Sequence, residues 1–204
     1  MSQQSNLEND ETLGGRLGLL RPQDLTADQH ELYHYLLNSK INWATRSHFQ
    51  GATEDGRLIG PFNVFLYSPH MGRAFNDYVD SEAKNTSLSP KVRQIVILTV
   101  GAVWNSAYEL YAHTAVARTV DLDDETIESI KVGKEPKHIS AEEVTAYDFT
   151  RKLVSEHTID DDLYKRATDT FGEKGVVDMI HLIGLYMATS ALLNAFEVPT
   201  PTQS

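Results

Sequence analysis

The chain has 204 residues, of which 41% are hydrophobic and 23% charged, as in an ordinary globular protein rather than a fibre or a disordered chain. Its formal net charge of -11 argues against nucleic-acid binding, which needs a basic surface. Cysteine is absent, which excludes disulfides, thiolate metal sites and thiol nucleophiles together.

The N-terminal segment MSQQSNLENDET is polar and acidic, and it lacks the basic and apolar stretches of a signal peptide. We therefore predict a flexible tail over residues 1–15, a single domain over residues 16–204, and a cytoplasmic location. The longest apolar tract, Met179–Phe196, is interrupted by polar side chains, so we interpret it as a largely buried helix and predict no membrane association.

The first helix is predicted from a capping-box spacing, in which Thr26 precedes Gln29, followed by apolar residues at helical spacing up to about Arg46. The next stretch, Gly51–Asn63, holds three glycines and a proline and is predicted to be a long loop. Loops of this length in compact domains are often functional.

Serine–proline pairs predict two helix starts, at Pro69 and Pro90, because serine caps a helix and proline suits its first position. The helix after Ser89 carries apolar residues on more than one side, so it should be buried on several faces. Further helices are expected from Asn105 or Ser106 to about Val120, from Asp124 to about Val132, from Ser140 for four turns, from Asp160 or Asp161 to Gly172, and from Glu173 to about Phe196. No segment alternates convincingly enough to be a strand, which indicates an all-α fold.

Three polar residues of the helix after Asn105, namely Ser106, Glu109 and His113, occupy positions i, i+3 and i+7 and share one face. A carboxyl group beside an imidazole can relay protons near neutral pH. An exposed i,i+4 pair that stabilises the helix by a few tenths of a kcal/mol explains the same spacing. A metal site is less favoured, because a third ligand such as His181 would come from far along the chain. Ser106 is not part of a GxSxG nucleophile motif.

The segment Ser89–Gly133, SPKVRQIVILTVGAVWNSAYELYAHTAVARTVDLDDETIESIKVG, resembles the core of carboxymuconolactone decarboxylase-like proteins, which belong to the all-α alkylhydroperoxidase D-like superfamily. The segments Ile59–Pro69, Tyr147–His157 and Phe171–Pro199 fit the same group, so the resemblance covers nearly everything after about residue 15. It implies a single-domain helical bundle of about seven to nine helices.

The peroxidase branch of this superfamily uses a glutamate, two cysteines three residues apart, and a histidine four residues beyond the second cysteine. These places fall on Gln94, Ser106, Glu109 and His113, so only the histidine remains. Thiol-dependent peroxide reduction is therefore not expected. The decarboxylase-type branch resembles the chain better, because its members keep an acid and the histidine on this helix.

The resemblance thus implies a cofactor-independent lyase or isomerase, with His113 and Glu109 as catalytic base and acid. Its substrate would be a small carboxylated or lactone-like carbonyl compound that loses carbon dioxide or shifts a double bond. Gln94 cannot act as a base, but it can hold a substrate carbonyl or orient His113. A non-catalytic ligand-binding or assembly protein is the alternative.

Other residues are expected to contact the substrate; these are Gln94, Ser106, Trp104 and Tyr108 near the acid–base helix, and Phe62, Asn63, Tyr67 and His70 from the family's helix arrangement. The second group is equally consistent with core and turn positions. His181 is expected to be a hydrogen-bonded core histidine, and Tyr186 and Met187 to be core residues. No metal or organic cofactor is expected. Relatives commonly form trimers or hexamers, so a homo-oligomer is predicted.

Overall fold

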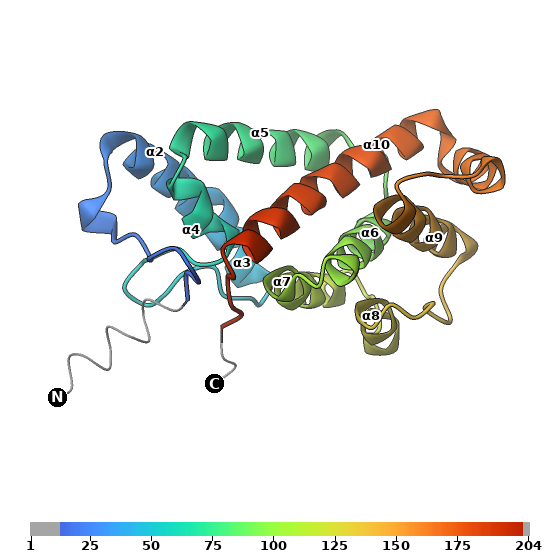
Figure 1. Ribbon diagram of the computed structural model, residues 1–204, viewed down its shortest axis with the longest axis horizontal. Helices are drawn as coiled ribbons and strands as arrows, with labels where there is room; N and C mark the ends of the chain where they lie inside the picture. The colour runs from blue at the N-terminus through green and yellow to red at the C-terminus, as the bar shows by residue number, and fades with distance from the viewer. Residues whose placement is uncertain (1–12, 202–204) are drawn as a thin grey trace. The chain divides into compact units, whose positions relative to one another are not determined.

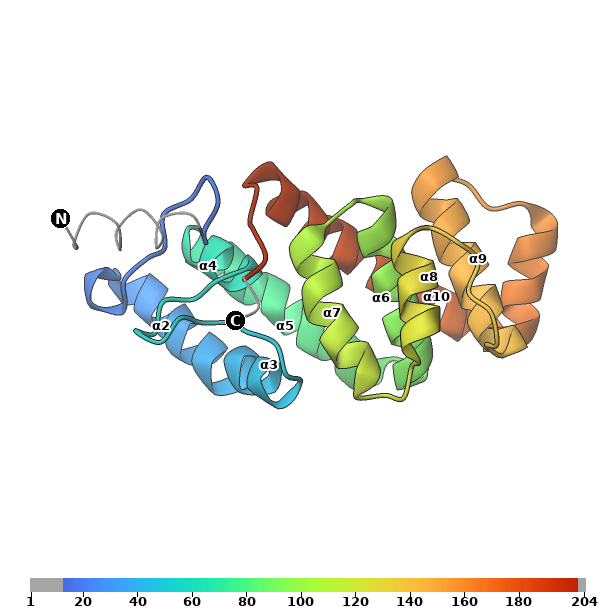
Figure 2. The same cartoon turned by 90° about the horizontal axis from the view of Figure 1, so that it is seen from below.

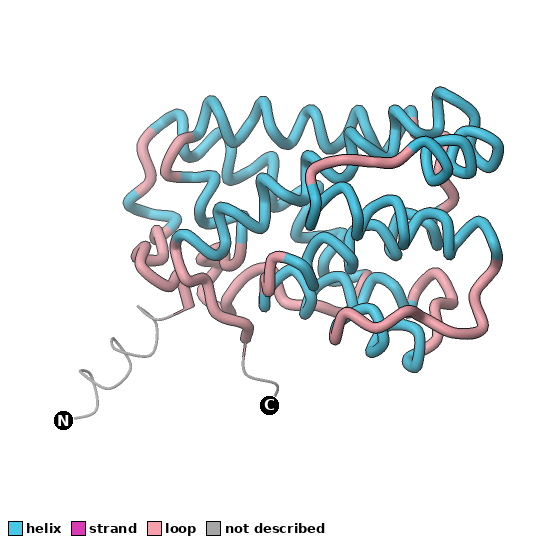
Figure 3. Tube along the Cα trace, turned by 45° about the vertical axis from the view of Figure 1, so that its right-hand side comes forward, coloured by secondary structure: helices cyan, strands magenta, loops and turns pink. Residues whose placement is uncertain are grey.

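The computed structural model describes residues 13–201, and within them every regular element is a helix apart from one isolated bridge between Ala52 and Leu58. Figure 3 shows these helices joined by loops, without a strand in the described part of the chain. The predicted all-α fold is confirmed. Most of the predicted N-terminal tail, residues 1–12, lies outside the described residues.

The chain divides into two compact units. In the described residues, the first comprises residues 13–78 and 191–201, and the second comprises residues 79–190. The expectation of one domain over residues 16–204 stays a prediction.

The first unit begins with a short 3-10 helix, η1 (Pro22–Asp24), and continues into α2 (Ala27–Leu36), a π-helical turn η2 (Leu37–Ile41) and α3 (Asn42–Arg46), drawn in blue in Figure 1. The predicted capping box is present, because the Thr26 side chain accepts from the backbone N–H of Gln29 while the Gln29 side chain accepts from that of Thr26. Helical structure ends at Arg46, as predicted.

The predicted loop Gly51–Asn63 is shorter than expected, because the helix α4 (Pro61–Leu66) begins inside it. All six residues of α4 are buried. Gly60, with φ 62° and ψ −147°, provides the turn that precedes α4, and Pro61 occupies its first position. The next helix, α5 (Pro69–Asn85), starts at the predicted proline.

The helix α6 (Pro90–Val103) is the centre of the second unit. It packs against α7 (Ala107–Arg118), α8 (Asp124–Lys131) and α9 (Ala141–Glu156), as Figures 1 and 2 show. Val96 and Val100 of α6 belong to one apolar cluster, called here the first, which also contains Phe149 and Met179. Ile95 and Leu98 belong to a second apolar cluster. This division confirms that α6 is buried on more than one face. Each buried aliphatic side chain of this kind contributes about 1.5–3 kcal/mol.

Local signals set the ends of these helices. Ser89 accepts from the Val92 N–H at the start of α6, and Asp123 accepts from Thr126 at the start of α8. Ser140 forms the predicted capping box with Glu143 at the start of α9.

The last helix, α10 (Asp161–Ala195), is interrupted at Gly172, whose φ of 67° and ψ of 170° are not helical. Two helices were predicted to meet at this glycine, and the break confirms the prediction. By length and composition alone, α10 could cross a membrane, but a core helix passes the same test. Its residues Val176, Met179 and Leu182 are buried in the first apolar cluster of the second unit.

Candidate functional site

Glu109 and His113 lie one turn apart on α7 and are both buried, with 4% and 5% of their surfaces exposed. The Nε2 atom of His113 is 3.4 Å from Oε1 of Glu109. The interpretation of this spacing as an exposed pair on the helix surface is therefore wrong. Because both ionisable groups are buried and in contact with each other, they are the candidate functional site of this unit.

Gln94, on α6, fixes the ring of His113. Its Oε1 atom lies 2.9 Å from Nδ1 of His113. An amide oxygen can only accept a hydrogen bond, so this arrangement places the proton on Nδ1. Nε2 then carries the lone pair, and it is the nitrogen that faces Glu109. Of the two expectations for Gln94, the structure shows the contact that orients His113.

The electrostatic environment makes both partners neutral at neutral pH. Burial raises the pKa of the Glu109 carboxyl group from 4.5 to about 8. Burial, and secondly the positive charge of Arg93, lowers the pKa of the His113 imidazole from 6.5 to about 3. Between about pH 3 and pH 8, Glu109 is protonated and His113 is neutral, with no proton on Nε2. The contact is one between a neutral acid and a neutral base.

Arg93 and Tyr186 lie near His113, and neither was predicted as a site residue from the sequence. Arg93 forms a buried ion pair with Glu82, whose side chain is 4% exposed. The Tyr186 ring of α10 stands perpendicular to the His113 ring, with 5.0 Å between the centroids. No sequence signal marks the Tyr186 contact, because the two residues are far apart in the chain. The position of Arg93 next to Gln94 is visible in the sequence, but its ion pair with Glu82 could not be predicted from it.

Tyr186 is half-buried rather than a fully buried core residue, although it packs against the first apolar cluster. Its hydroxyl group makes no hydrogen bond to another residue of the described range 13–201. Burial raises the pKa of this phenol, and the charge of Glu109 acts in the same direction. The phenol therefore stays a hydrogen-bond donor at neutral pH.

Ser106 and Glu109 have the spacing of a capping box at the start of α7, yet they do not form one. Ser106 is the N-cap residue without a side-chain cap bond, and its buried Oγ has no hydrogen-bond partner among the described residues. The Glu109 carboxyl group is directed to His113 instead. Such a cap bond is worth about 1 kcal/mol, so its absence needs a compensating use of these side chains.

The aromatic residues predicted near this helix are also placed in the second unit. Tyr108 is 2% exposed and meets Tyr111 edge-on, with ring centroids 5.8 Å apart. Trp104 is the C-cap residue of α6 and packs against the first apolar cluster. Gly101 lets α6 and α7 approach closely, because a Cβ atom there would lie 3.2 Å from Leu110 Cδ2.

The remaining predicted residues belong to the first unit and have structural contacts there. Phe62 is buried. The Asn63 side chain accepts from the Leu20 N–H at 3.1 Å and donates to the Gly18 carbonyl at 3.2 Å. The exposed Tyr67 donates to the same carbonyl at 2.7 Å.

His70 of the first unit is exposed, and its Nε2 atom is 3.3 Å from Asp28. His181 of the second unit is exposed as well. The expectation that His181 is a core histidine is therefore wrong, because it lies on the outer side of α10. Within residues 13–201, no three His, Asp or Glu side chains are grouped closely enough to hold a metal ion.

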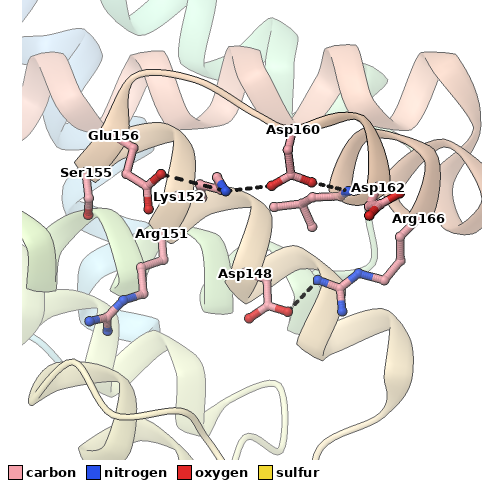
Figure 4. Close-up of a pocket in the computed structure, with 9 residues that line it drawn as sticks. Asp148, Arg151, Lys152, Ser155, Glu156, Asp160, Asp162 and Arg166 are labelled. Atoms are coloured by element: carbon pink, nitrogen blue, oxygen red, sulfur yellow. Dashed lines mark hydrogen bonds and ion pairs between the residues drawn. The ribbon is translucent and has the colours of Figure 1, made fainter.

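The second unit has two surface depressions, and neither is lined by Glu109 or His113. The larger, of about 620 Å³, is shown in Figure 4 and is lined by α9 and the start of α10. Lys152 contacts Asp160 at 2.5 Å, and Arg166 contacts Asp148 at 2.5 Å, so its charges largely satisfy one another. The smaller, of about 370 Å³, adjoins the ends of α6 and α8. No predicted site residue lines either depression.

Comparison with known proteins agrees with this fold. Residues 69–152 match the model of the Carboxymuconolactone decarboxylase family, which confirms the resemblance predicted from the sequence over this segment. A search of curated proteins gives no match.

Solved structures match over most of the chain. An uncharacterized peroxidase-related protein from Silicibacter sp. TM1040 has a TM-score of 0.73 and 15% identity, with 93% of each chain covered. An uncharacterized peroxidase-related protein with an alkylhydroperoxidase AhpD core, from Ralstonia eutropha JMP134, gives the same values. A protein of unknown function from Agrobacterium tumefaciens, related by name to the antioxidant defence protein AhpD, has a TM-score of 0.64 and 15% identity, with 69% of this chain and 97% of that chain covered. At this identity the likeness shows the alkylhydroperoxidase D-like fold alone.

Proposed function

We propose that this chain, a cysteine-free protein with a carboxymuconolactone decarboxylase family segment, transfers protons to and from carbon in a small carboxylated or lactone-like carbonyl compound. The supporting observation is the buried, neutral acid–base pair of Glu109 and His113, with the tautomer of His113 set by Gln94. Neither a thiol nor a metal enters the proposal.

In the isomerisation form of the reaction, Nε2 of His113 removes a proton from carbon next to the carbonyl group, and the electrons pass to the carbonyl oxygen as an enolate. The Glu109 carboxyl group then protonates a different carbon, which shifts the double bond. The proton on His113 returns to the Glu109 carboxylate across their contact, which restores both neutral groups.

In the decarboxylation form, the substrate carboxylate leaves as carbon dioxide and its bonding electrons form the same enolate. Glu109 delivers the proton that completes the product, and the solvent restores it. Because Glu109 is protonated at neutral pH, it does not repel an anionic substrate. Tyr186 is the proposed donor to the enolate oxygen, since its phenol is protonated and its hydroxyl is not used within residues 13–201.

The degree of burial sets a condition on this mechanism. About 95% of the surface of each catalytic side chain is covered, so neighbouring groups have to move before substrate reaches them. The same closure favours the alternative, a ligand-binding or assembly protein that does not catalyse turnover. In that alternative, Glu109 and His113 would bind a ligand or support the assembly without converting a substrate to product.

We also propose that the chain forms a trimer or hexamer in solution. On α10, Val177 and Ile180 are 52% and 46% exposed, and burial of such residues between copies would be favourable. Light scattering that returns the mass of a single chain would contradict this proposal.

Incubation with carboxymuconolactone and related β-keto acids or lactones tests the function. We expect turnover by the wild-type protein and a loss of at least a hundredfold in both His113→Ala and Glu109→Gln. Turnover that is unchanged in both variants would show that other residues carry the activity. Saturable binding without turnover would favour the ligand-binding alternative.

Two of the similar structures are named as peroxidase-related proteins, so thiol-dependent peroxide reduction has to be considered. Without cysteine, this chain lacks both the attacking thiolate and its resolving partner. We therefore expect a hydroperoxide assay to be negative.

A further inference from the structure

The helix α2 of the first unit carries a pair of histidines in a metal-binding sequence pattern. His30-Glu31-Leu32-Tyr33-His34 has the form HExxH, in which two histidines one turn apart on a helix can bind one metal ion. Both histidines are exposed. Their ring centroids are 4.6 Å apart, with 46° between the ring planes.

This separation is close to the one that a shared metal ion requires. With metal–nitrogen distances of about 2.0–2.1 Å and a tetrahedral angle, two imidazole centroids lie about 5 Å apart. The centroids of His30 and His34 are therefore within about half an ångström of this separation, and the two rings also have to turn one nitrogen each towards the ion. Side-chain rotation at an exposed helix surface provides a movement of that size easily.

Tyr33 supports this pair from the side of the protein. Its ring meets the His34 ring at 5.5 Å and the His30 ring at 6.3 Å, both edge-on. Tyr33 is itself 7% exposed, and its hydroxyl donates to the Gly56 carbonyl at 2.9 Å. An anchored ring beside both histidines restricts their side chains and so lowers the entropy that metal binding would cost.

We propose that His30 and His34 form a binding site for a divalent transition-metal ion with an affinity for imidazole, such as Zn²⁺, Ni²⁺ or Cu²⁺. In the described residues, no third His, Asp or Glu completes a set of three ligands, so water occupies the remaining coordination positions. Glu31, at the place of the general base of zinc proteases with this motif, is exposed.

The number of protein ligands separates this site from the catalytic centre of a zinc protease. A catalytic zinc site has three protein ligands, and within residues 13–201 no group of three His, Asp or Glu side chains that could hold a metal ion is present. The site is therefore a two-histidine binding site and not a protease-type centre. This proposal is independent of the proton-transfer function, because it concerns only residues of the first unit.

Isothermal titration of the full, tag-free chain after removal of metals by a chelator tests the site. We expect one Cu²⁺, Ni²⁺ or Zn²⁺ ion per chain, with Cu²⁺ bound most tightly, and no saturable heat with Mg²⁺, which prefers oxygen ligands. His30→Gln and His34→Gln should each weaken binding at least tenfold. Both side chains are exposed, so both variants should keep the circular dichroism spectrum of the wild type.

His70→Gln is the matched control, because His70 is an exposed histidine of the same unit that contacts an aspartate and no second histidine. It should bind metal as the wild type does. Electron paramagnetic resonance of the Cu²⁺ complex should show two coordinated imidazole nitrogens. The absence of one-to-one binding, or equal binding by the double variant of His30 and His34, would overturn the proposal. A loss in Glu31→Gln as large as that in His30→Gln would overturn the two-histidine ligand set.

Discussion

Replacement of Glu109 by glutamine should change stability in a way that depends strongly on pH. Glutamine has the shape of the protonated carboxyl group, and its amide can donate to Nε2 of His113. Burial raises the pKa of Glu109 from 4.5 in the unfolded chain to about 8 in the folded protein. The folded wild type therefore keeps a proton that the unfolded chain releases between these two values.

The sign of the effect follows from this linkage. Because the folded pKa is raised, the contribution of Glu109 to stability is fully present below pH 4.5 and is lost as the pH rises towards 8. Each pH unit in the window costs about 1.4 kcal/mol, so an interval of about 3.5 units amounts to about 5 kcal/mol. Glu109→Gln lacks this loss. Its advantage over the wild type should grow from near zero at pH 4.5 to about 5 kcal/mol at pH 8.

Urea denaturation of both proteins at matched concentration, from pH 4.5 to 8.5, measures this difference. His113 is present in both proteins, so its own contribution cancels in the comparison. A difference that does not vary with pH would refute the raised pKa of Glu109. A wild type that is more stable than Glu109→Gln at pH 8 would show that Glu109 is ionised and paired in the folded state.

Three further substitutions test separate parts of the structure. Glu82→Gln should destabilise the protein by about 3–5 kcal/mol in urea denaturation, because it leaves the largely buried charge of Arg93 without its partner. A cost below about 1 kcal/mol would show that water solvates Arg93 in place of Glu82. Gly172→Ala should lower the free energy of unfolding by about 1–3 kcal/mol, because φ 67° and ψ 170° are accessible almost only to glycine. A steric clash is not the reason, since a Cβ atom there would meet nothing within 4 Å. An unchanged stability would mean that the backbone at the break in α10 relaxes without cost. Tyr186→Phe should leave the urea midpoint unchanged, since the hydroxyl makes no hydrogen bond within residues 13–201. It should lower turnover at least tenfold, because the phenol is the proposed donor to the enolate oxygen. If the wild type is active and Tyr186→Phe is equally active, Tyr186 has no part in the mechanism.

Local features of the fold were predictable from the sequence. The capping boxes at Thr26 and Ser140, the start of α6 after Ser89 and the break at Gly172 each depend on a few neighbouring residues. The one clear error in the elements, α4 within the predicted loop, arose because its six residues form a helix too short for periodicity to reveal.

The candidate site was only partly predictable. The spacing of Glu109 and His113 placed them on one face of α7, but whether that face is buried depends on how α6 and α10 pack against it. The contacts of Gln94 and Tyr186 with His113 join residues far apart in the chain, which no local pattern encodes. The HExxH pattern on α2 is the opposite case, because its spacing is fully visible in the sequence.

The central claim is that His113 is a neutral base with its proton on Nδ1, held beside a protonated Glu109. Nitrogen-15 NMR of the histidine side chains, with the His113 signals assigned by comparison with His113→Gln, measures both the protonation state and the tautomer. We predict an imidazole that remains neutral between pH 5 and 8, with the proton on Nδ1 and none on Nε2. A His113 that becomes charged near its ordinary pKa of 6.5, or that carries its proton on Nε2, would contradict it.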